Sequence, residues 1–210
     1  MKVVLLSITP TAEKLIERAG RTAYLSTRKQ RQGTEKKFIR MLVKSGHHSV
    51  LEHANATFRI KGISRASSHQ FVRHRFCSFT QKSQRYVAEH NFEYIEPASI
   101  QDNKKAHSLF KDFMNRAKNT YVELQKLNIK KEDARFVLPN AVETELVVTA
   151  NFREWRHIIE TRGSLKAQWE IRKLAITILK ILIKHAPTVF SDYVIDKKSD
   201  VIRKVKSEPH

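Results

Sequence analysis

The chain has 210 residues, with 40 Lys and Arg against 21 Asp and Glu, and a formal net charge of +19. That length suits one hydrophobic core, and the single cysteine, Cys77, excludes a disulfide framework and indicates a reducing compartment, the cytoplasm. No stretch approaches the ~20 apolar residues of a membrane span, and the first apolar run is too short for a secretion signal. The positive charge favours anionic partners.

The first third of the sequence predicts short strands alternating with helices. Lys2–Ile8 is typical of a buried strand, and Thr9 with Pro10 predicts the start of a helix that runs towards Tyr24. Gln30–Gly33 is a polar loop. The next segments are a helix capped by Thr34 with Phe38, Ile39, Leu42 and Val43 on one face, a strand over Asn55–Ile60 ending at Gly62, and a helix over Ser64–Arg73 capped by Ser64.

The remainder predicts longer helices and one clear strand. The expected elements are a strand over Phe92–Ile95, a helix over Asn103–Leu127 with Leu109, Phe113, Ala117, Tyr121 and Leu124 on one face, a short helix over Glu132–Leu138, a strand over Glu143–Ala150, and helices over Phe152–Thr161 and Ala167–Ala186. Gly163 is expected to end the first of the last two helices. No repeat, low-complexity tract or linker interrupts the chain, so we expect a single α+β domain over residues 1–195 and a solvated basic C-terminal tail over 196–210.

The most informative segment spans residues 71–86. It places Arg73, His74, Arg75 and Arg85 close together, with hydroxyl groups and aromatic rings between them, and no acidic residue lies between Ile63 and Ala88. Guanidinium groups bind phosphate through two parallel hydrogen bonds, and hydroxyls donate to its other oxygens. The segment therefore predicts binding of anionic ligands. The alternative from another class is an RNA-binding protein that uses these cations as a phosphate track and the rings as stacking platforms.

Two catalytic alternatives near this segment are weaker. Neighbouring cations would favour the thiolate of Cys77, but a lone cysteine is more often inert and buried, and no base can be assigned to it. The histidines at 47, 48 and 53 lie near Glu52, but their spacing matches no strong ligand pattern, so no metal is expected.

A second cluster lies between Asn151 and Arg162. Arg153 and His157 are four residues apart on a predicted helix and should share one face. Arg162 is nine residues beyond Arg153, about half a turn round the helix, and is expected to address a different group.

The order Arg73-His74-Arg75, seven residues, then Ser83 resembles the RHR motif of the flavin-dependent thymidylate synthases. Further segments agree in the same order, namely Ser45–His53, Gly62–Arg65, Ala134–Asn140, Ala150–His157, Thr161–Arg162, Ala167–Arg172 and Ala186–Phe190. The resemblance covers roughly residues 15–195. It implies an α+β fold with a small antiparallel sheet flanked by helices.

The resemblance also implies an activity. It is the conversion of dUMP to dTMP, with methylenetetrahydrofolate as carbon donor, NADPH as reductant and FAD as hydride carrier, in a homotetramer with sites shared between subunits and no role for membrane or nucleic acid. Arg162 would be catalytic, stabilising negative charge on the pyrimidine. FAD contacts would fall on Ser49, Arg73, His74, Arg75, Gln81, Asn151, Phe152, Arg153 and His157. The dUMP contacts would fall on Gln70, Phe71, Val72, Arg73, Gln81, Lys82, Ser83, Gln84, Arg85, Arg135 and Arg162.

This chain departs from some members of the family at three positions. Gln81 stands where some carry Glu, Thr80 where some carry Asn, and Ala23 where some have a hydroxyl near the flavin. None of these differences removes a group with an implied catalytic role.

Overall fold

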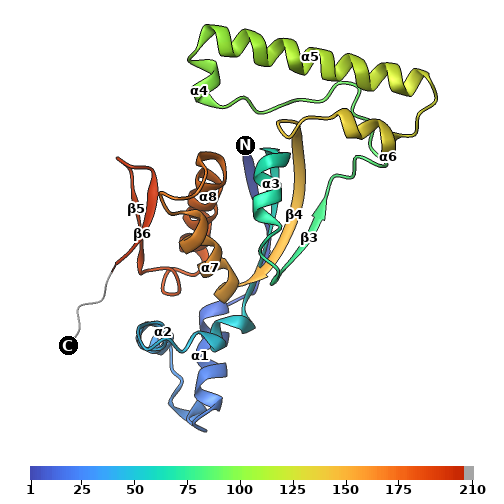
Figure 1. The fold of residues 1–210 in the computed structure, drawn as a ribbon. Helices are drawn as coiled ribbons and strands as arrows, with labels where there is room; N and C mark the ends of the chain where they lie inside the picture. Colours follow the sequence, from blue (N-terminus) through green and yellow to red (C-terminus); the bar gives the residue numbers. More distant parts are fainter. Residues whose placement is uncertain (206–210) are drawn as a thin grey trace. The chain divides into compact units, whose positions relative to one another are not determined.

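The computed structural model describes residues 1–205 (Figure 1). The strands are β1 (Lys2–Ile8), β2 (Asn55–Ser64), β3 (Cys77–Gln81), β4 (Glu143–Asn151), β5 (Tyr193–Asp196) and β6 (Val201–Lys204). The helices are α1 (Ala12–Thr22), α2 (Thr34–Lys44), α3 (Arg65–Phe71), α4 (Ala98–Gln101), α5 (Lys104–Lys126), α6 (Lys131–Ala134), α7 (Phe152–Arg162) and α8 (Trp169–His185). Short 3-10 helices lie at Thr27–Lys29, His48–His53 and Arg135–Val137. Within the described residues, no helix is both long and apolar enough to cross a membrane.

The strands form one larger sheet and one hairpin. The larger sheet has four strands in the order β1-β2-β4-β3, and β5 pairs with β6 in an antiparallel hairpin. The chain divides into two compact units: residues 1–2, 60–70 and 80–146 form unit 1, and residues 3–59, 71–79 and the chain from 147 onward form unit 2. Each strand of the larger sheet has residues in both units. The expectation of one α+β fold with small antiparallel sheets is confirmed.

Helix α1, in unit 2, begins later than its sequence predicts. Thr9 instead extends the pairing of β1, because its backbone N donates to the carbonyl of Asn55 at 3.0 Å and its hydroxyl accepts from the backbone N of Asn55 at 2.9 Å. The chain then turns at Thr11, whose φ is 46°, and the helix starts at the next residue and ends at Thr22. The prediction of a cap at Thr9 is wrong because the same side chain is used in strand pairing.

Two further helix starts show which cap residues the structure uses. Thr34 is the first residue of α2 rather than its cap, since Gly33, with a φ of 84°, takes the cap position and the Thr34 hydroxyl bonds the backbone of Arg31. A positive φ favours glycine, so the turn sets this start. Ser64 caps α3 as predicted, its Oγ accepting from the backbone N of Ser67 at 3.0 Å. That helix ends at Phe71, two residues before the predicted end.

In unit 1, α5 begins as predicted, because the side chain of Asn103 accepts hydrogen bonds from the first turn at 3.1 Å. Its buried side chains are Met114, Ala117 and Tyr121. Leu109 and Phe113 are 70% and 51% exposed, so that part of the predicted face is wrong. The predicted strand over Phe92–Ile95 is also wrong, since only an isolated pairing of Tyr94 with Val142 forms there. The short helix beginning near residue 132 is present as α6 and the 3-10 turn that follows it.

In unit 2, α7 and α8 match their predicted spans within two residues. Their caps are Asn151 and Gln168, whose side chains accept from the backbone N of Glu154 at 2.9 Å and of Glu170 at 3.0 Å. The core beside α7 includes edge-to-face contact of Trp155 with the ring of Phe58, their centroids 5.0 Å apart.

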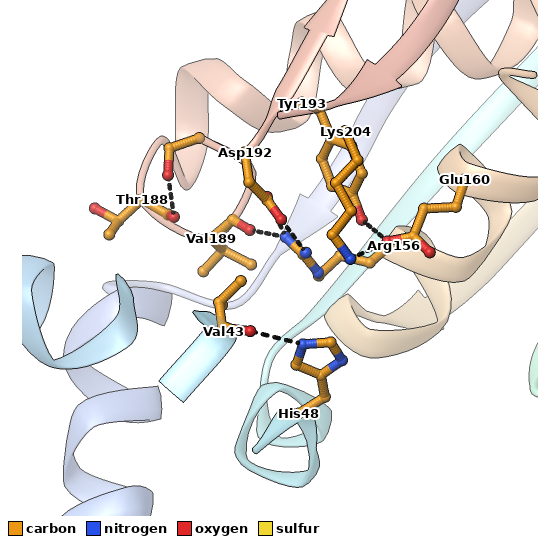
Figure 2. Close-up of polar contacts among 10 residues, drawn as sticks. Val43, His48, Arg156, Glu160, Thr188, Val189, Asp192, Tyr193 and Lys204 are labelled. Carbon is orange, nitrogen blue, oxygen red and sulfur yellow. Dashed lines mark hydrogen bonds and ion pairs between the residues drawn. The ribbon is translucent and has the colours of Figure 1, made fainter. Parts of the chain in front are cut away.

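The hairpin β5-β6 corrects the expectation of a solvated tail from residue 196. Val201 and Ile202 are buried, and the backbone N of Ile202 donates to the carbonyl of Gly163 at 2.8 Å. Figure 2 shows the polar network beside this hairpin, in which the guanidinium of Arg156 reaches the carboxylate of Asp192 and the carbonyl of Val189. Residues 206–210 of the expected tail lie outside the described residues.

Candidate active site

A cavity of about 530 Å³ in unit 2 gathers most of the predicted flavin contacts. Its lining residues are Glu52, Arg73, His74, Arg75, Phe76, Asn151, Arg153, Glu154 and His157. The RHR segment follows the end of α3, and the other side of the cavity comes from the first two turns of α7. Both Arg153 and His157 line it, so the prediction that they share one helix face is confirmed.

His74 lies at the centre of this arrangement. It is 5% exposed, its Nδ1 lies 3.2 Å from Oε1 of Glu154, and its Nε2 accepts a hydrogen bond of 2.9 Å from Nε of Arg162. Burial, together with the charges of Arg162 and His157, lowers the pKa of His74 to about 4. The imidazole is therefore neutral at pH 7.

The hydrogen bonds of His74 also define the position of Arg162. Arg162 comes from the last turn of α7, and its side chain reaches the histidine that lines the cavity of Arg153 and His157. Arg162 is not among the residues that line this cavity, and the expectation that it addresses a different group from Arg153 and His157 stays a prediction.

The cavity is cationic, and its acids are engaged. Arg153 forms an ion pair of 2.6 Å with Glu52, and Glu154 is held by His74, whereas Arg73 and Arg75 are exposed residues that line the cavity. Phe76 is 82% exposed and adds an apolar ring to the lining. Guanidinium groups beside an exposed ring suit a ligand that carries both phosphate and an aromatic system.

Among the described residues, the group of side chains close enough to hold a metal is His74, Glu154 and His157, rather than the histidines near Glu52 considered from the sequence. Their ligand atoms lie within 4.8 Å of one another. However, both ring nitrogens of His74 are already hydrogen-bonded, to Glu154 and to Arg162. A cation here would have to displace one of these partners and would lie beside a guanidinium group.

Cys77 is a poor nucleophile in this environment. Burial, with the nearby charge of Glu154, raises the pKa of the thiol to about 12. The suggestion that neighbouring cations favour its thiolate is wrong, because desolvation and the carboxylate outweigh them.

A second polar group lies in unit 1 and contains most of the remaining predicted nucleotide contacts. The amide of Gln81 donates to the hydroxyls of Ser68 at 2.9 Å and Thr144 at 3.0 Å. The guanidinium of Arg85 pairs with Glu132 at 3.1 Å, and Nε of Arg135 donates to the carbonyl of Glu132 at 3.0 Å. Lys82 pairs with Glu89, and Ser83 accepts from the backbone N of Arg85.

Arg65 organises this group, and it had no assigned role in the sequence analysis. Its Nη2 donates to Oε1 of Gln84 at 2.9 Å and its Nη1 to the carbonyl of Lys82 at 3.3 Å. It also lines a cavity of about 280 Å³ together with Arg135 and His69. A cation in the first turn of a helix opposes the helix dipole, which is the signal that could have identified it.

Some of the implied contact residues cannot act through their side chains. Phe71 and Phe152 are fully buried, the first against Phe79 and Trp155 and the second against Phe190. Their side chains belong to the core, so the contacts predicted for these two residues would have to come from the backbone. Ser49 is exposed and is not part of the cavity lining, although Glu52 of the same 3-10 helix is.

Comparison with known proteins decides the family. The family model described as "Thymidylate synthase complementing protein" matches residues 4–188. The chain is also 42% identical to the flavin-dependent thymidylate synthase of Geobacter sulfurreducens over 200 residues, which is 91% of this chain and 86% of that protein. The chain belongs to the flavin-dependent thymidylate synthase family. A second member, from Mycolicibacterium gilvum, is 42% identical over 89% of this chain and 81% of its own length.

The fold agrees with a solved flavin-dependent thymidylate synthase. Thymidylate Synthase X (ThyX) from Helicobacter pylori, whose structure was determined with FAD and dUMP, matches with a TM-score of 0.77 and 26% identity. The match covers 91% of this chain and 98% of that chain. The family resemblance that the RHR motif and the ordered segments indicated is therefore confirmed.

Proposed function

We propose that this chain is a flavin-dependent thymidylate synthase that methylates dUMP to dTMP. Methylenetetrahydrofolate would supply the carbon and NADPH the reducing equivalents. The observation that carries the proposal is the cationic cavity built by the RHR segment and α7, in a chain that belongs to this family. The reducing compartment indicated by the single cysteine supports a cytoplasmic location.

The residues present fit FAD. Arg73, Arg75 and Arg153 offer guanidinium groups for its diphosphate, and His157 and Asn151 offer further polar groups. When bound, FAD would accept electrons from NADPH and pass a hydride to the nucleotide. The protein would supply binding, orientation and a cationic surrounding for this chemistry.

For dUMP, we propose Arg85 and Arg135 as phosphate ligands and Gln81 as a contact of the base. A homotetramer with sites shared between subunits is part of this proposal. Arg162 would stabilise negative charge on the pyrimidine, which is electrostatic catalysis without a covalent bond to the enzyme.

The first test is the visible absorbance spectrum of the purified protein before and after FAD is added. Anaerobic NADPH is then added with and without dUMP, and dTMP is measured after methylenetetrahydrofolate is supplied. A flavin spectrum that NADPH bleaches at a rate altered by dUMP, followed by dTMP formation, supports the proposal. Well-folded protein that takes up no flavin and binds RNA with strong salt dependence would favour the RNA-binding alternative.

A further inference from the structure

We propose that Glu154 is a positioning residue that acts through His74 to hold the guanidinium of Arg162. This inference rests on the proposed function, in which Arg162 stabilises charge on the nucleotide. Glu154 itself has no place among the contacts that the family resemblance implies.

The direction of the hydrogen bonds carries the argument. Nε of an arginine can only donate, so Nε2 of His74, 2.9 Å away, must be unprotonated to accept its hydrogen. A neutral imidazole then carries its proton on Nδ1, which lies 3.2 Å from Oε1 of Glu154. The carboxylate is therefore the group that selects this tautomer, and the tautomer in turn presents an acceptor to Arg162.

The backbone around Glu154 keeps the carboxylate in place. Its backbone N donates to Oδ1 of Asn151, the cap of α7, which fixes the first turn of the helix. The side chains of Glu154 and His74 are 8% and 4% exposed. Burial raises the pKa of Glu154, and the charge of His157 opposes that shift. Few alternative rotamers or water partners are open to a carboxylate in such a position.

The ring of His74 links two ends of the same helix. Glu154 and Arg162 are eight residues apart on α7, a rise of about 12 Å. A flexible arginine at the end of a helix would otherwise lose its orientation, and ordering such a side chain on binding costs rotamer entropy. The preformed bond to Nε2 meets that cost before the nucleotide arrives, which is the advantage of a preorganised site.

The charges around His74 make this tautomer sensitive to the carboxylate. Arg162 faces Nε2 of His74, Glu154 faces Nδ1, and the ring centroid of His157 lies 5.4 Å from that of His74. Burial, and to a smaller extent the charge of Arg73, lowers the pKa of the Arg162 guanidinium. A protonated His74 would lose its acceptor and repel Arg162. Without the acceptor on Glu154, the ring can move its proton to Nε2 and reject the arginine.

The experiment compares Glu154→Gln with Glu154→Leu. Glutamine keeps an oxygen acceptor for the Nδ1 proton, whereas leucine keeps only the size. We expect Glu154→Gln to stay within about threefold of wild-type kcat, and Glu154→Leu to lose at least tenfold in kcat while KM for dUMP changes less than about threefold. Both variants should retain FAD. Equal losses in the two variants, or no loss in either, would overturn the proposal.

A second readout is independent of turnover. In protein labelled with ¹⁵N-histidine and free of ligands, His74 should carry its proton on Nδ1 at pH 7 in the wild type and in Glu154→Gln. The signal should change in Glu154→Leu. Glu52→Gln is the matched control, since it removes a carboxylate charge from the same cavity without contact to His74.

The ¹⁵N measurement also separates two kinds of failure. A wild-type protein that makes no dTMP would defeat the proposed function, and the ring signal would still report what Glu154 does to His74. A wild-type ring protonated on Nε2, or on both nitrogens, would overturn the positioning role even if Glu154→Leu fails to fold.

Discussion

The carboxylate of Asp192 binds both terminal nitrogens of the Arg156 guanidinium, at 2.7 Å and 2.5 Å (Figure 2). Arg156 is 2% exposed, lies 4.6 Å from the ring centroid of Tyr193 and donates a further hydrogen bond to the carbonyl of Val189. This pair ties α7 to the segment before the C-terminal hairpin. A buried charge of this kind depends strongly on its partner.

Replacing Asp192 by alanine should therefore destabilise the protein. It leaves the Arg156 charge buried and unpaired, which costs about 3–5 kcal/mol in the free energy of unfolding. The control is Glu123→Ala, which breaks an exposed surface pair with Lys126 and should cost less than about 1 kcal/mol. Urea unfolding at one fixed protein concentration measures both. Similar costs for the two variants would contradict the importance of the buried pair.

Gly163 is predicted to tolerate no side chain. Its φ is −81°, so any residue could adopt the backbone conformation, but a Cβ there would lie 2.5 Å from Cδ1 of Ile202 and 2.6 Å from the carbonyl oxygen of Ile159. Gly163→Ala should lower the free energy of unfolding by about 1–3 kcal/mol through overpacking. Adding Ile202→Ala should not restore full stability, because the backbone contact remains. If Gly163→Ala were as stable as the wild type, the end of α7 and the β5-β6 hairpin could move apart to make room for the methyl group at little cost in free energy.

Cys77→Ala should retain most of the thymidylate synthase activity. The thiol has a pKa raised to about 12 by burial and by Glu154, so almost no thiolate exists at pH 7. Activity is measured as dTMP formed by flavin-loaded protein. Complete loss in a folded, flavin-loaded variant would show that the thiol is needed after all.

Arg162→Ala should fold and hold FAD but lose dTMP formation by at least about 100-fold, as expected when a donor to a developing charge is removed. Its guanidinium bonds His74 and forms no part of the hydrophobic core. The flavin spectrum and its bleaching by NADPH serve as the control for an intact cofactor site. Near-normal turnover would remove Arg162 from the proposed mechanism.

Acid should destabilise the protein through His74. The folded-state pKa is lowered from 6.5 to about 4, so the unfolded chain binds more protons between these values, and stability is complete above pH 6.5 and falls as the pH drops towards 4. Between pH 7 and pH 5 the wild type should lose about 2 kcal/mol more than His74→Asn, which cannot titrate. Urea unfolding at the two pH values, at equal protein concentration, gives the difference. Equal losses would mean that the folded-state pKa of His74 is not lowered below its unfolded value.

Much of the fold could be predicted from local pattern. The alternation of Glu143–Asn151 and the capping residues Asn103 and Ser64 defined their elements because side-chain period and local hydrogen bonds act within a few residues. Thr9 misled the prediction because its hydroxyl serves the backbone of Asn55, which only the folded chain brings near. Thr34 misled it because its hydroxyl bonds the backbone of Arg31, three residues before it, while Gly33 takes the cap position. The hairpin at Tyr193–Lys204 was missed because its lysines and aspartates suggest solvent, while Val201 and Ile202 find a core made by distant residues.

The sequence by itself determined the family and the chemical character of the site. Two groups of residues provide side chains that bind anions whatever the tertiary structure is. They are Arg73-His74-Arg75 with Ser83, and Arg153 with His157. Only the tertiary structure decided that Glu154, His74 and Arg162 form one hydrogen-bonded series and that Cys77 is protonated. The physical reason is that tautomer, burial and pKa depend on partners up to 88 residues away in the chain, and no local pattern encodes such distances.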